Sequence, residues 1–243
     1  AQTLVGKGAL AHDHPLIRGM AGFRGTKFLN DRCKAAGRIP GLGPRFPGGD
    51  CSSGEPAYPF HLPTAKIVHI DIDPAEIGKN FPTAVPIVGS AKNVLPRLTG
   101  LVKEQTHPNW ISWIDNQREL HPSLHIRESR RMLPQYVVRS IYEETQGNAN
   151  IVTGVGQHQM WAGQHYFYNR PRQLITSGGL GTMGFELPAA IGAQVALPDM
   201  ETWAICGDGS FQMTLQEMAV LVDEQLPVKM AIFNNGYLGM IRQ

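Results

Sequence analysis

The sequence predicts an α/β protein made of two doubly wound parallel-sheet domains. β-branched apolar runs alternate with helical patterns along much of the chain, and strands that alternate with helices build parallel sheets. The length of 243 residues suits two modest domains. Glycine, amide and carboxylate residues follow the clearest apolar runs, at the strand ends where such sheets bind ligands.

The first predicted domain covers residues 1–103, and its regular segments are short. We expect a strand under way at residue 3, a strand over 66–73, a short helix opened by Pro74, a strand over 86–89 and a helix over 91–103. Residues 30–64 are crowded with Gly, Pro, Arg and Ser and show no period. We therefore expect no apolar core strand before Leu42.

A linker is predicted over residues 104–130, where charges and prolines interrupt the pattern, with some packing through Trp110 and Trp113. The second domain, predicted over 131–243, has the clearer pattern. Its expected helices and strands are helices over 134–146, 184–197 and 211–224 and strands over 151–155, 173–176, 202–206 and 228–233.

Composition narrows the class of protein. A chain that is 42% hydrophobic and 17% charged is typical of a soluble globular protein. A formal charge of +2 is too small to indicate a nucleic-acid partner. No apolar run reaches the roughly 18 residues of a membrane span, and no signal peptide is visible, so we expect a cytoplasmic protein. Neither end has the features of a frayed terminus, so we expect a fragment of a longer chain.

Four loops that follow the strands of the second domain share glycine, amide or carboxylate groups. Because the carboxyl ends of parallel strands lie at one edge of a sheet, we expect these loops to meet there. They are Gly156-Gln157-His158-Gln159, Ser177-Gly178-Gly179-Leu180-Gly181, Gly207-Asp208-Gly209-Ser210 and Asn234-Asn235-Gly236.

The third loop combines a phosphate site with a carboxylate. Its glycines let the backbone approach an anion, and the helix start behind it offers free N–H groups. Asp208 would repel a phosphate unless a cation lay between them, and Mg²⁺ binds both carboxylate and phosphate oxygens. Asn235 ends the next strand and can supply an amide oxygen to the same ion. Each segment alone also fits a simple turn, but their spacing favours a metal site.

This pair of motifs resembles the signature of the thiamine diphosphate enzymes. The resemblance implies that Asp208, Asn235 and the backbone carbonyl of Tyr237 bind magnesium, which in turn holds the cofactor's diphosphate. Over residues 134–243 the resemblance narrows to one family within this group. The segments 154–162, 176–184 and 213–217 resemble the large, catalytic subunit of acetolactate synthase (acetohydroxyacid synthase).

The resemblance also implies which residues contact thiamine diphosphate. Three roles are distinguished: residues that line the diphosphate, residues that donate to it, and Met183, which lies under the thiazolium ring and bends the cofactor. The implied contacts are Gly156, Gln157, His158, Gly181, Met183, Asp208, Gly209, Ser210, Asn235, Tyr237, Leu238, Gly239 and Met240. No catalytic residue is expected in this chain, because the family's glutamate belongs to an N-terminal domain that is missing here.

The first predicted domain resembles the same family's middle domain, which binds FAD in a largely structural role. The matching segments are 3–8, His14-Pro15 and 69–79, with a weaker match over 42–46. The residues implied to contact FAD are Thr3, Leu4, Gly22, Arg45, Asp71, Ile72 and Gly89.

Several positions depart from the family pattern. The departures are Arg24 for a histidine, Pro47 and Gly48 for two aspartates, Ser90 for an aspartate and Glu186 for a glycine. The first four bear on FAD binding. The fifth places a charge at a helix start, where the helix dipole tolerates it. Since the N-terminal domain and the segment that closes the site are absent, we expect no catalysis by this chain alone.

The parent activity implied is the decarboxylation of pyruvate and the transfer of the hydroxyethyl unit to pyruvate or 2-oxobutyrate, in the synthesis of valine, leucine and isoleucine. A homodimer or tetramer of the full-length chain with a regulatory small subunit is implied as well. Two alternatives stay open, namely another thiamine diphosphate carboligase or decarboxylase, such as glyoxylate carboligase, and a non-catalytic cofactor-binding remnant. A nicotinamide-binding domain is disfavoured, because no acidic residue follows the glycines of 179–184 at the required distance.

Overall fold

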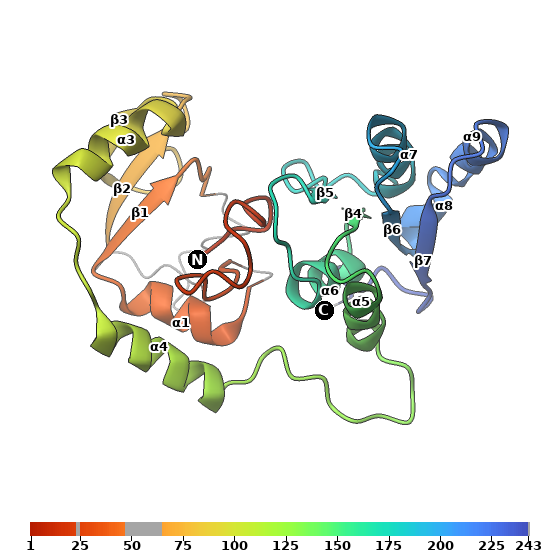
Figure 1. Cartoon of the computed structure of the whole chain (residues 1–243), viewed down its shortest axis with the longest axis horizontal. Helices are drawn as coiled ribbons and strands as arrows, with labels where there is room; N and C mark the ends of the chain where they lie inside the picture. Colours follow the sequence, from red (N-terminus) through yellow and green to blue (C-terminus); the bar gives the residue numbers. More distant parts are fainter. Residues whose placement is uncertain (23–24, 47–64, 243) are drawn as a thin grey trace. The chain divides into compact units, whose positions relative to one another are not determined.

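The computed structural model describes residues 1–22, 25–46 and 65–242, and the chain forms two compact units (Figure 1). The first unit contains Ala1 and Ala21–Ser123, and the second combines Gln2–Met20 with the chain from Leu124 onward. Each unit is built around a parallel sheet, so the predicted α/β class is confirmed. None of the helices in the described part of the chain is long and apolar enough to span a bilayer.

The first unit holds a three-stranded parallel sheet in the order β1-β2-β3. A small apolar core of Phe46, Ile67 and Phe81 lies against it. Its elements are the strands β1 (Arg38–Leu42), β2 (Lys66–Asp71) and β3 (Thr83–Val88) and the helices α1 (Lys27–Ala35), α3 (Ala91–Leu101) and α4 (Pro108–Leu120).

The strand β1 adds to the expectation for residues 30–64, because no apolar core strand was predicted before Leu42 and the strand found there is not an apolar one. β1 lies at the edge of the sheet and pairs with β2 alone. An edge strand needs backbone hydrogen bonds on one side only and tolerates a proline such as Pro40. Only Gly41 of β1 is buried, so the strand carries no apolar pattern that could have predicted it.

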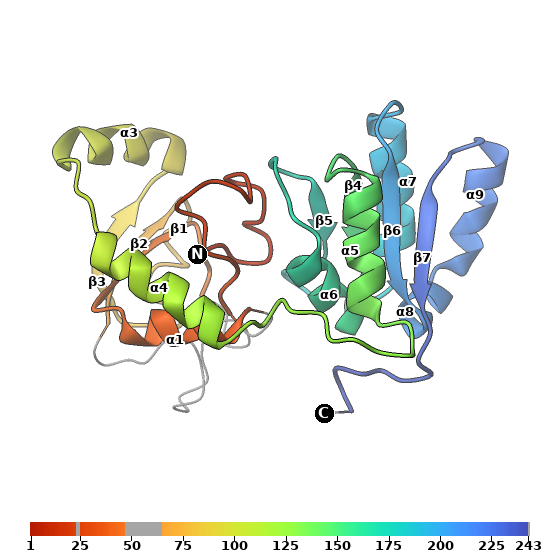
Figure 2. The ribbon, with the colours of Figure 1, turned by 60° about the horizontal axis from the view of Figure 1, so that its bottom comes forward.

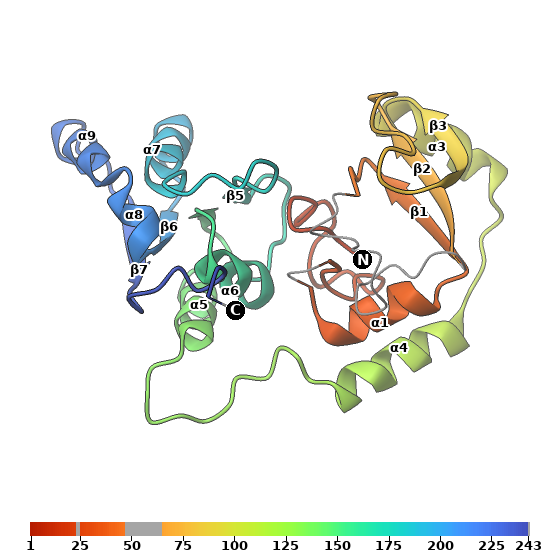
Figure 3. The ribbon, with the colours of Figure 1, turned by 180° about the vertical axis from the view of Figure 1, so that it is seen from behind.

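Two further expectations for the first 103 residues were wrong, and the expected linker, which packs through its tryptophans as predicted, also contains a helix. The segment after Pro74 forms hydrogen-bonded turns rather than a helix. The segment from residue 3 forms turns, with a single bridge between Gln2 and Met20. The predicted linker contains α4, which contacts α1 (Figure 3). The rings of Trp110 and Trp113 stack there at 5.3 Å between centroids, and the Arg32 guanidinium of α1 contacts both rings.

The second unit holds a four-stranded sheet in the order β5-β4-β6-β7, and all its pairings are parallel. The predicted strands and the helices expected over 134–146 and 184–197 are present with slightly shifted ends, whereas the single helix expected over 211–224 is divided into α8, η1 and α9. The strands are β4 (Asn150–Thr153), β5 (Leu174–Thr176), β6 (Thr202–Gly207) and β7 (Lys229–Phe233). The helices are α5 (Pro134–Glu144), α6 (Gln157–His165), α7 (Glu186–Ala196), α8 (Asp208–Gln212), the 3₁₀ helix η1 (Leu215–Glu217) and α9 (Met218–Asp223).

Helices cover both faces of this sheet, as Figure 2 shows for α5 and α7. Ile151 and Ile205 belong to a core cluster with residues of α5 and α6. Val152 and Ala204 belong to a second cluster with residues of α7. Because successive side chains of a strand point to opposite faces, strands that are apolar at every position can bury both.

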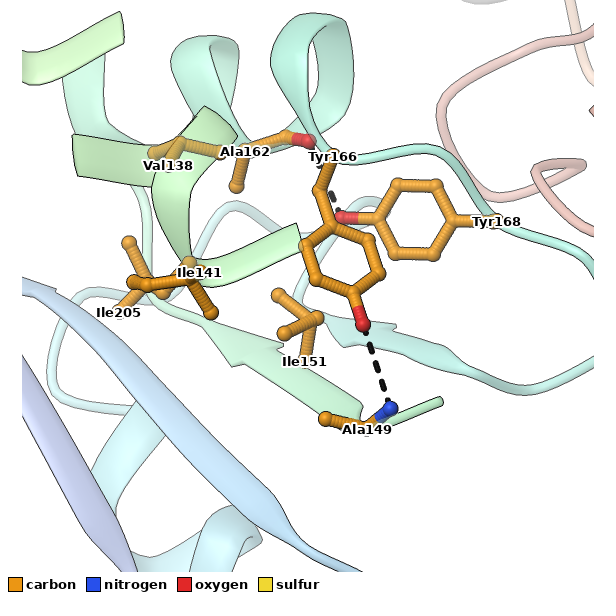
Figure 4. Packing of buried hydrophobic residues seen from close by; sticks show 8 residues of the cluster. All are labelled: Val138, Ile141, Ala149, Ile151, Ala162, Tyr166, Tyr168 and Ile205. Carbon is orange, nitrogen blue, oxygen red and sulfur yellow. Dashed lines mark hydrogen bonds between the residues drawn. The ribbon is translucent and has the colours of Figure 1, made fainter. Parts of the chain in front are cut away.

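Two tyrosines that follow α6 form buried hydrogen bonds (Figure 4). The Tyr166 hydroxyl accepts a hydrogen bond of 3.2 Å from the backbone N–H of Ala149, directly before β4. The Tyr168 hydroxyl donates to the carbonyl of Ala162 at 3.1 Å. Both tyrosines are almost completely buried, so these bonds satisfy polar groups that no water reaches.

The segment Gln2–Met20 packs within the second unit. Gly163 of α6 leaves room for Leu4 and Met20, because a Cβ on this glycine would meet Leu4 at 2.9 Å and Met20 at 3.5 Å. The backbone N–H of His12 donates to the carbonyl of Tyr168 at 3.1 Å. The segment therefore packs against α6 and against the residues that follow this helix.

Candidate functional site

Strand order places the candidate site at the carboxyl ends of β4 and β6. After β4 the chain continues to β5, which lies on one side of β4. It then continues to β6, which lies on the other side of β4. Loops that follow two neighbouring strands in opposite directions leave a crevice between them, and α/β sheets bind ligands in such crevices. The loops that start at Gly154 and Gly207 border this point.

A pocket of about 310 Å³ opens there. Every residue that the sequence implied for thiamine diphosphate lines it, from Gly156 to Met240. The lining also includes residues that sequence reasoning missed: Val155, Trp161, Gly207, Phe233 and Ile241. The rings of Trp161 and Phe233 lie 5.7 Å apart between centroids. The missed residues stand next to motif residues in the sequence, and this proximity was the one signal that could have indicated them.

The start of α6 forms one wall of the pocket. Free N–H groups at a helix start favour an anion. His158, in the first turn, is buried, and its Nε2 has no hydrogen-bond partner in the described part of the chain. Burial lowers the pKa of His158 to about 4, and the negative charge of Asp208 offsets part of this effect. The ring is therefore neutral at pH 7.

Two glycines make room for this histidine. A Cβ on Gly156 would lie 2.8 Å from the His158 ring, and a Cβ on Gly207 would lie 2.7 Å from it. No side chain other than hydrogen fits at either position without moving the ring. The glycines of the two loops thus let His158 occupy the space between the ends of β4 and β6.

The loop after β7 folds back onto the start of α8. Asp208 Oδ2 accepts a hydrogen bond of 3.1 Å from the backbone N–H of Gly236. Asn235 Oδ1 accepts one of 3.0 Å from the N–H of Tyr237, and its Nδ2 donates to Gln157 Oε1 at 3.3 Å. The structure therefore brings the three implied magnesium ligands, Asp208, Asn235 and Tyr237, into one loop pair that also contacts α6.

The donor set fits magnesium better than a transition metal. No group of three or more His, Cys, Asp or Glu side chains that could hold a metal is found among the described residues. One carboxylate with amide and backbone carbonyl oxygens is a set of hard oxygen donors, and Mg²⁺ completes such sets with phosphate oxygens and water. Gly209 leaves the backbone open beside Leu238, since a Cβ there would lie 2.9 Å from that side chain.

The segment that carries Met183 is held by hydrogen bonds to α8 and to the residues that follow this helix. Ser210 Oγ accepts a hydrogen bond of 2.9 Å from the backbone N–H of Gly184. Thr214 Oγ1 donates to the Gly184 carbonyl at 2.9 Å. These two bonds fix Gly184, which has a positive φ of 78°, and with it the position of Met183 at the pocket wall.

Glu186 lies behind Ser210 and is completely buried. Its Oε2 accepts a hydrogen bond of 2.9 Å from Ser210 Oγ. Burial raises the pKa of Glu186, and the hydrogen bond from Ser210 offsets part of this effect. Burial also raises the pKa of Cys206, with a further contribution from the negative charge of Glu186. The departure from the family pattern at this position thus puts a carboxyl group into the interior.

The residues implied for FAD are divided between the two units. Arg45, Asp71, Ile72 and Gly89 follow the three strands of the first unit, and the N–H of Gly89 donates to the Asp71 carbonyl at 2.8 Å. Gly22 lies elsewhere in this unit, paired through both backbone groups with the Asn30 side chain. Thr3 and Leu4 belong to the second unit. The departures at Arg24, Pro47 and Gly48 lie outside the described residues.

Comparison with known proteins identifies the family. Residues 1–98 match the model of the thiamine pyrophosphate enzyme central domain. Residues 154–243 match that of the C-terminal TPP binding domain. The chain belongs to the thiamine pyrophosphate enzymes. In this family the C-terminal domain is the one named for cofactor binding, and its match begins at Gly154, where β4 ends and the pocket begins.

Relatives of this thiamine pyrophosphate enzyme chain include named acetolactate synthases. This chain is 43% identical over 248 residues to the acetolactate synthase large subunit of Mycobacterium tuberculosis, and the match covers 99% of this chain and 40% of the relative. It is 45% identical over 242 residues to the acetolactate synthase large subunit of Lactococcus lactis, and the match covers 99% of this chain and 41% of the relative. It is 43% identical over 247 residues to acetolactate synthase 1, chloroplastic, of rice, covering 99% and 38%. The chain thus spans about two fifths of the length of these relatives.

Proposed function

We propose that this chain forms the cofactor-anchoring part of an acetolactate synthase large subunit. The observation that carries the proposal is the pocket at the β4 and β6 ends, in which Asp208 and the Asn235 loop meet. The support from relatives is an identity of 43–45% to acetolactate synthase large subunits along nearly the whole chain. The complete protein would decarboxylate pyruvate and join the two-carbon unit to pyruvate or 2-oxobutyrate.

In this proposal each wall of the pocket has its own task. Asp208, Asn235 and the Tyr237 carbonyl hold Mg²⁺, which neutralises the repulsion between Asp208 and a diphosphate. The helix starts at Gln157 and Gly209 direct N–H groups at the diphosphate. Met183, which also lines the pocket, supports the ring end of the cofactor.

Thiamine diphosphate, when bound, supplies the stabilised carbanion chemistry, and the protein supplies binding and orientation. Trp161, Phe233 and Leu238 make the inner wall apolar, which keeps water from the ring end. Neutral His158 can accept or donate a hydrogen bond without adding charge. No side chain of this chain is assigned a proton transfer.

The remaining parts of the proposal follow from the family resemblance of the sequence. FAD would lie against the strand ends of the first unit. A homodimer or tetramer of the full-length chain would complete the active site, and a small subunit would regulate it. Synthesis of branched-chain amino acids in the cytoplasm is the corresponding role. Each of these belongs to the complete protein rather than to this chain alone.

Asp208→Ala tests the metal site. We expect magnesium-dependent binding of thiamine diphosphate, followed by quenching of Trp161 fluorescence, to be lost in this variant. Exposed Asp199, outside the pocket lining, offers a matched control, because Asp199→Ala removes the same charge. Equal affinity of Asp208→Ala and the unchanged chain would refute the metal assignment.

The activity itself is tested separately on the complete protein. Formation of 2-acetolactate from pyruvate supports the proposal. Activity with glyoxylate but not pyruvate would indicate another carboligase, and cofactor binding without turnover of either would indicate a non-catalytic remnant.

A further inference from the structure

Glu186 is a buried carboxyl group that the proposed site does not use. It is the first residue of α7 and is completely buried. Its carboxylate and Ser210 Oγ fill the space in which a Cβ on Gly154 would lie. Gly154 directly precedes Val155 and Gly156 of the pocket lining. The carboxylate therefore lies one residue behind the pocket wall, between the ends of β4 and β6.

The Ser210 hydroxyl is fully committed to protein groups. Its oxygen accepts from the N–H of Gly184 at 2.9 Å, and its single proton goes to Glu186 Oε2 at 2.9 Å. A serine hydroxyl has only one proton to donate. Although Ser210 lines the pocket, its hydroxyl has nothing left to donate to a phosphate oxygen while Glu186 holds that proton.

No salt bridge to Glu186 is present among the described residues. Its second oxygen, Oε1, has no hydrogen-bond partner among the described residues. The described residues that line the pocket include no Lys or Arg. A magnesium ion at Asp208 would offset the charge of that aspartate, whereas Glu186 offers its negative charge to the back of the same site. Carboxylates repel phosphates strongly where water is excluded.

We propose that Glu186 sets the affinity of the pocket for the diphosphate group, by withholding the Ser210 proton and by adding a buried negative charge behind the site. Glu186 is a positioning residue in this view, because it acts through Ser210 and touches no ligand itself. The inference rests on the proposed function, since it takes the ligand of the pocket to be a diphosphate.

The test compares binding of two ligands to two variants of the purified chain. Glu186→Gln keeps the shape but removes the charge, and its amide can donate to Ser210 and free the hydroxyl proton. We expect this variant to bind magnesium thiamine diphosphate about tenfold more tightly than the unchanged chain. Unphosphorylated thiamine should bind both equally, because it has no group that meets Ser210. A merely structural role would change the two affinities together.

Controls separate the contributions. Glu224→Gln removes an exposed carboxylate after α9 and should change neither affinity. Adding Ser210→Ala to Glu186→Gln should remove most of the gain. Glu186→Gly is the second variant in case glutamine fits poorly, and it should also bind the diphosphate more tightly.

Each outcome decides one of the two ideas. If all chains bind thiamine diphosphate with the same affinity, the role of Glu186 is wrong and the proposed function stands. A gain that is equal for thiamine and for its diphosphate also overturns the role. If neither the unchanged chain nor any variant binds thiamine diphosphate with magnesium, the proposed function fails and this inference fails with it.

Discussion

The buried His165 of the second unit shows how a single residue links the stability of this fold to pH. Burial lowers the pKa of His165 to about 4, and the nearby positive charge of Arg139 contributes further. Its Nδ1 has no hydrogen-bond partner in the described part of the chain. The histidine is thus held neutral in the folded state, while in the unfolded chain it titrates near the ordinary value of 6.5.

His165→Phe should therefore flatten the pH dependence of stability. Below pH 6.5 the unfolded chain binds a proton that the folded chain refuses, so stability falls as the pH decreases from 6.5 towards 4. Between pH 7.5 and pH 5 we expect the unchanged chain to lose about 1–2 kcal/mol more than the variant. Urea unfolding at the two pH values measures this. Equal losses would mean that His165 is protonated in the folded state.

Residue-level chemistry also explains which site residues could be predicted. The meeting of Asp208 and Asn235 in one pocket was predictable, because both residues follow neighbouring strands and carry the oxygen donors that Mg²⁺ prefers. Phe233 and Trp161 were not, because an apolar residue in a strand or helix has the same pattern whether it faces a core or a pocket. The placement of Glu186 against Ser210 depends on a contact across 24 positions of sequence, which no local pattern encodes.

At the scale of elements, burial decided what the sequence could predict. β4 and β6 are buried along most of their length, so their apolar runs predicted strands. α6 was missed because its buried residues include His158, Gln159 and His165, which hide the apolar face that predicts a helix. Gln159 is accommodated by donating to Thr176 of β5 at 2.8 Å. Tertiary contacts rather than periodicity hold this helix in place.

Tyr166→Phe tests the hydrogen bond that joins the end of α6 to the start of β4. Removal of the hydroxyl leaves the buried N–H of Ala149 without its 3.2 Å partner. It also removes the 3.1 Å contact with Thr145 Oγ1 of the turn after α5. An unsatisfied buried donor costs about 1–3 kcal/mol, and we expect a loss of this size in urea unfolding.

Tyr136→Phe is the matched control for this change. Tyr136 lies in α5 with 58% of its surface exposed, so water can replace whatever its hydroxyl contacts. We expect a change close to zero. A loss as large as that of Tyr166→Phe would show that the hydroxyl itself, rather than its buried partner, governs the effect.

At the scale of the whole molecule, the chain from Gln2 onward crosses between the units twice. It leaves the second unit after Met20 and returns at Leu124. The boundaries predicted from sequence assigned residues 1–103 to one domain. Composition could not indicate otherwise, because the docking of residues 2–20 depends on small residues of distant segments, such as Gly163, that leave room for it.

Gly8→Ala should weaken the second unit although it lies 116 positions before the unit's main segment begins at Leu124. Gly8 has a φ of 80°, and the Arg170 carbonyl occupies the space that a Cβ would need. The variant combines the cost of a left-handed backbone, about 1–2 kcal/mol, with displacement of the segment from Arg170. We expect faster hydrogen exchange at the amides of β4 and β6.

Gly43→Ala separates strain from docking. Gly43 also has a positive φ, of 67°, but nothing lies within 4 Å of its Cβ position, and it belongs to the first unit. This variant should incur the backbone cost and leave exchange in β4 and β6 unchanged. If Gly8→Ala also leaves hydrogen exchange in β4 and β6 unchanged, residues 2–20 contribute nothing to the stability of the second unit. If exchange rises only in Gly8→Ala, a segment matched by the central-domain model stabilises the sheet that carries the cofactor pocket.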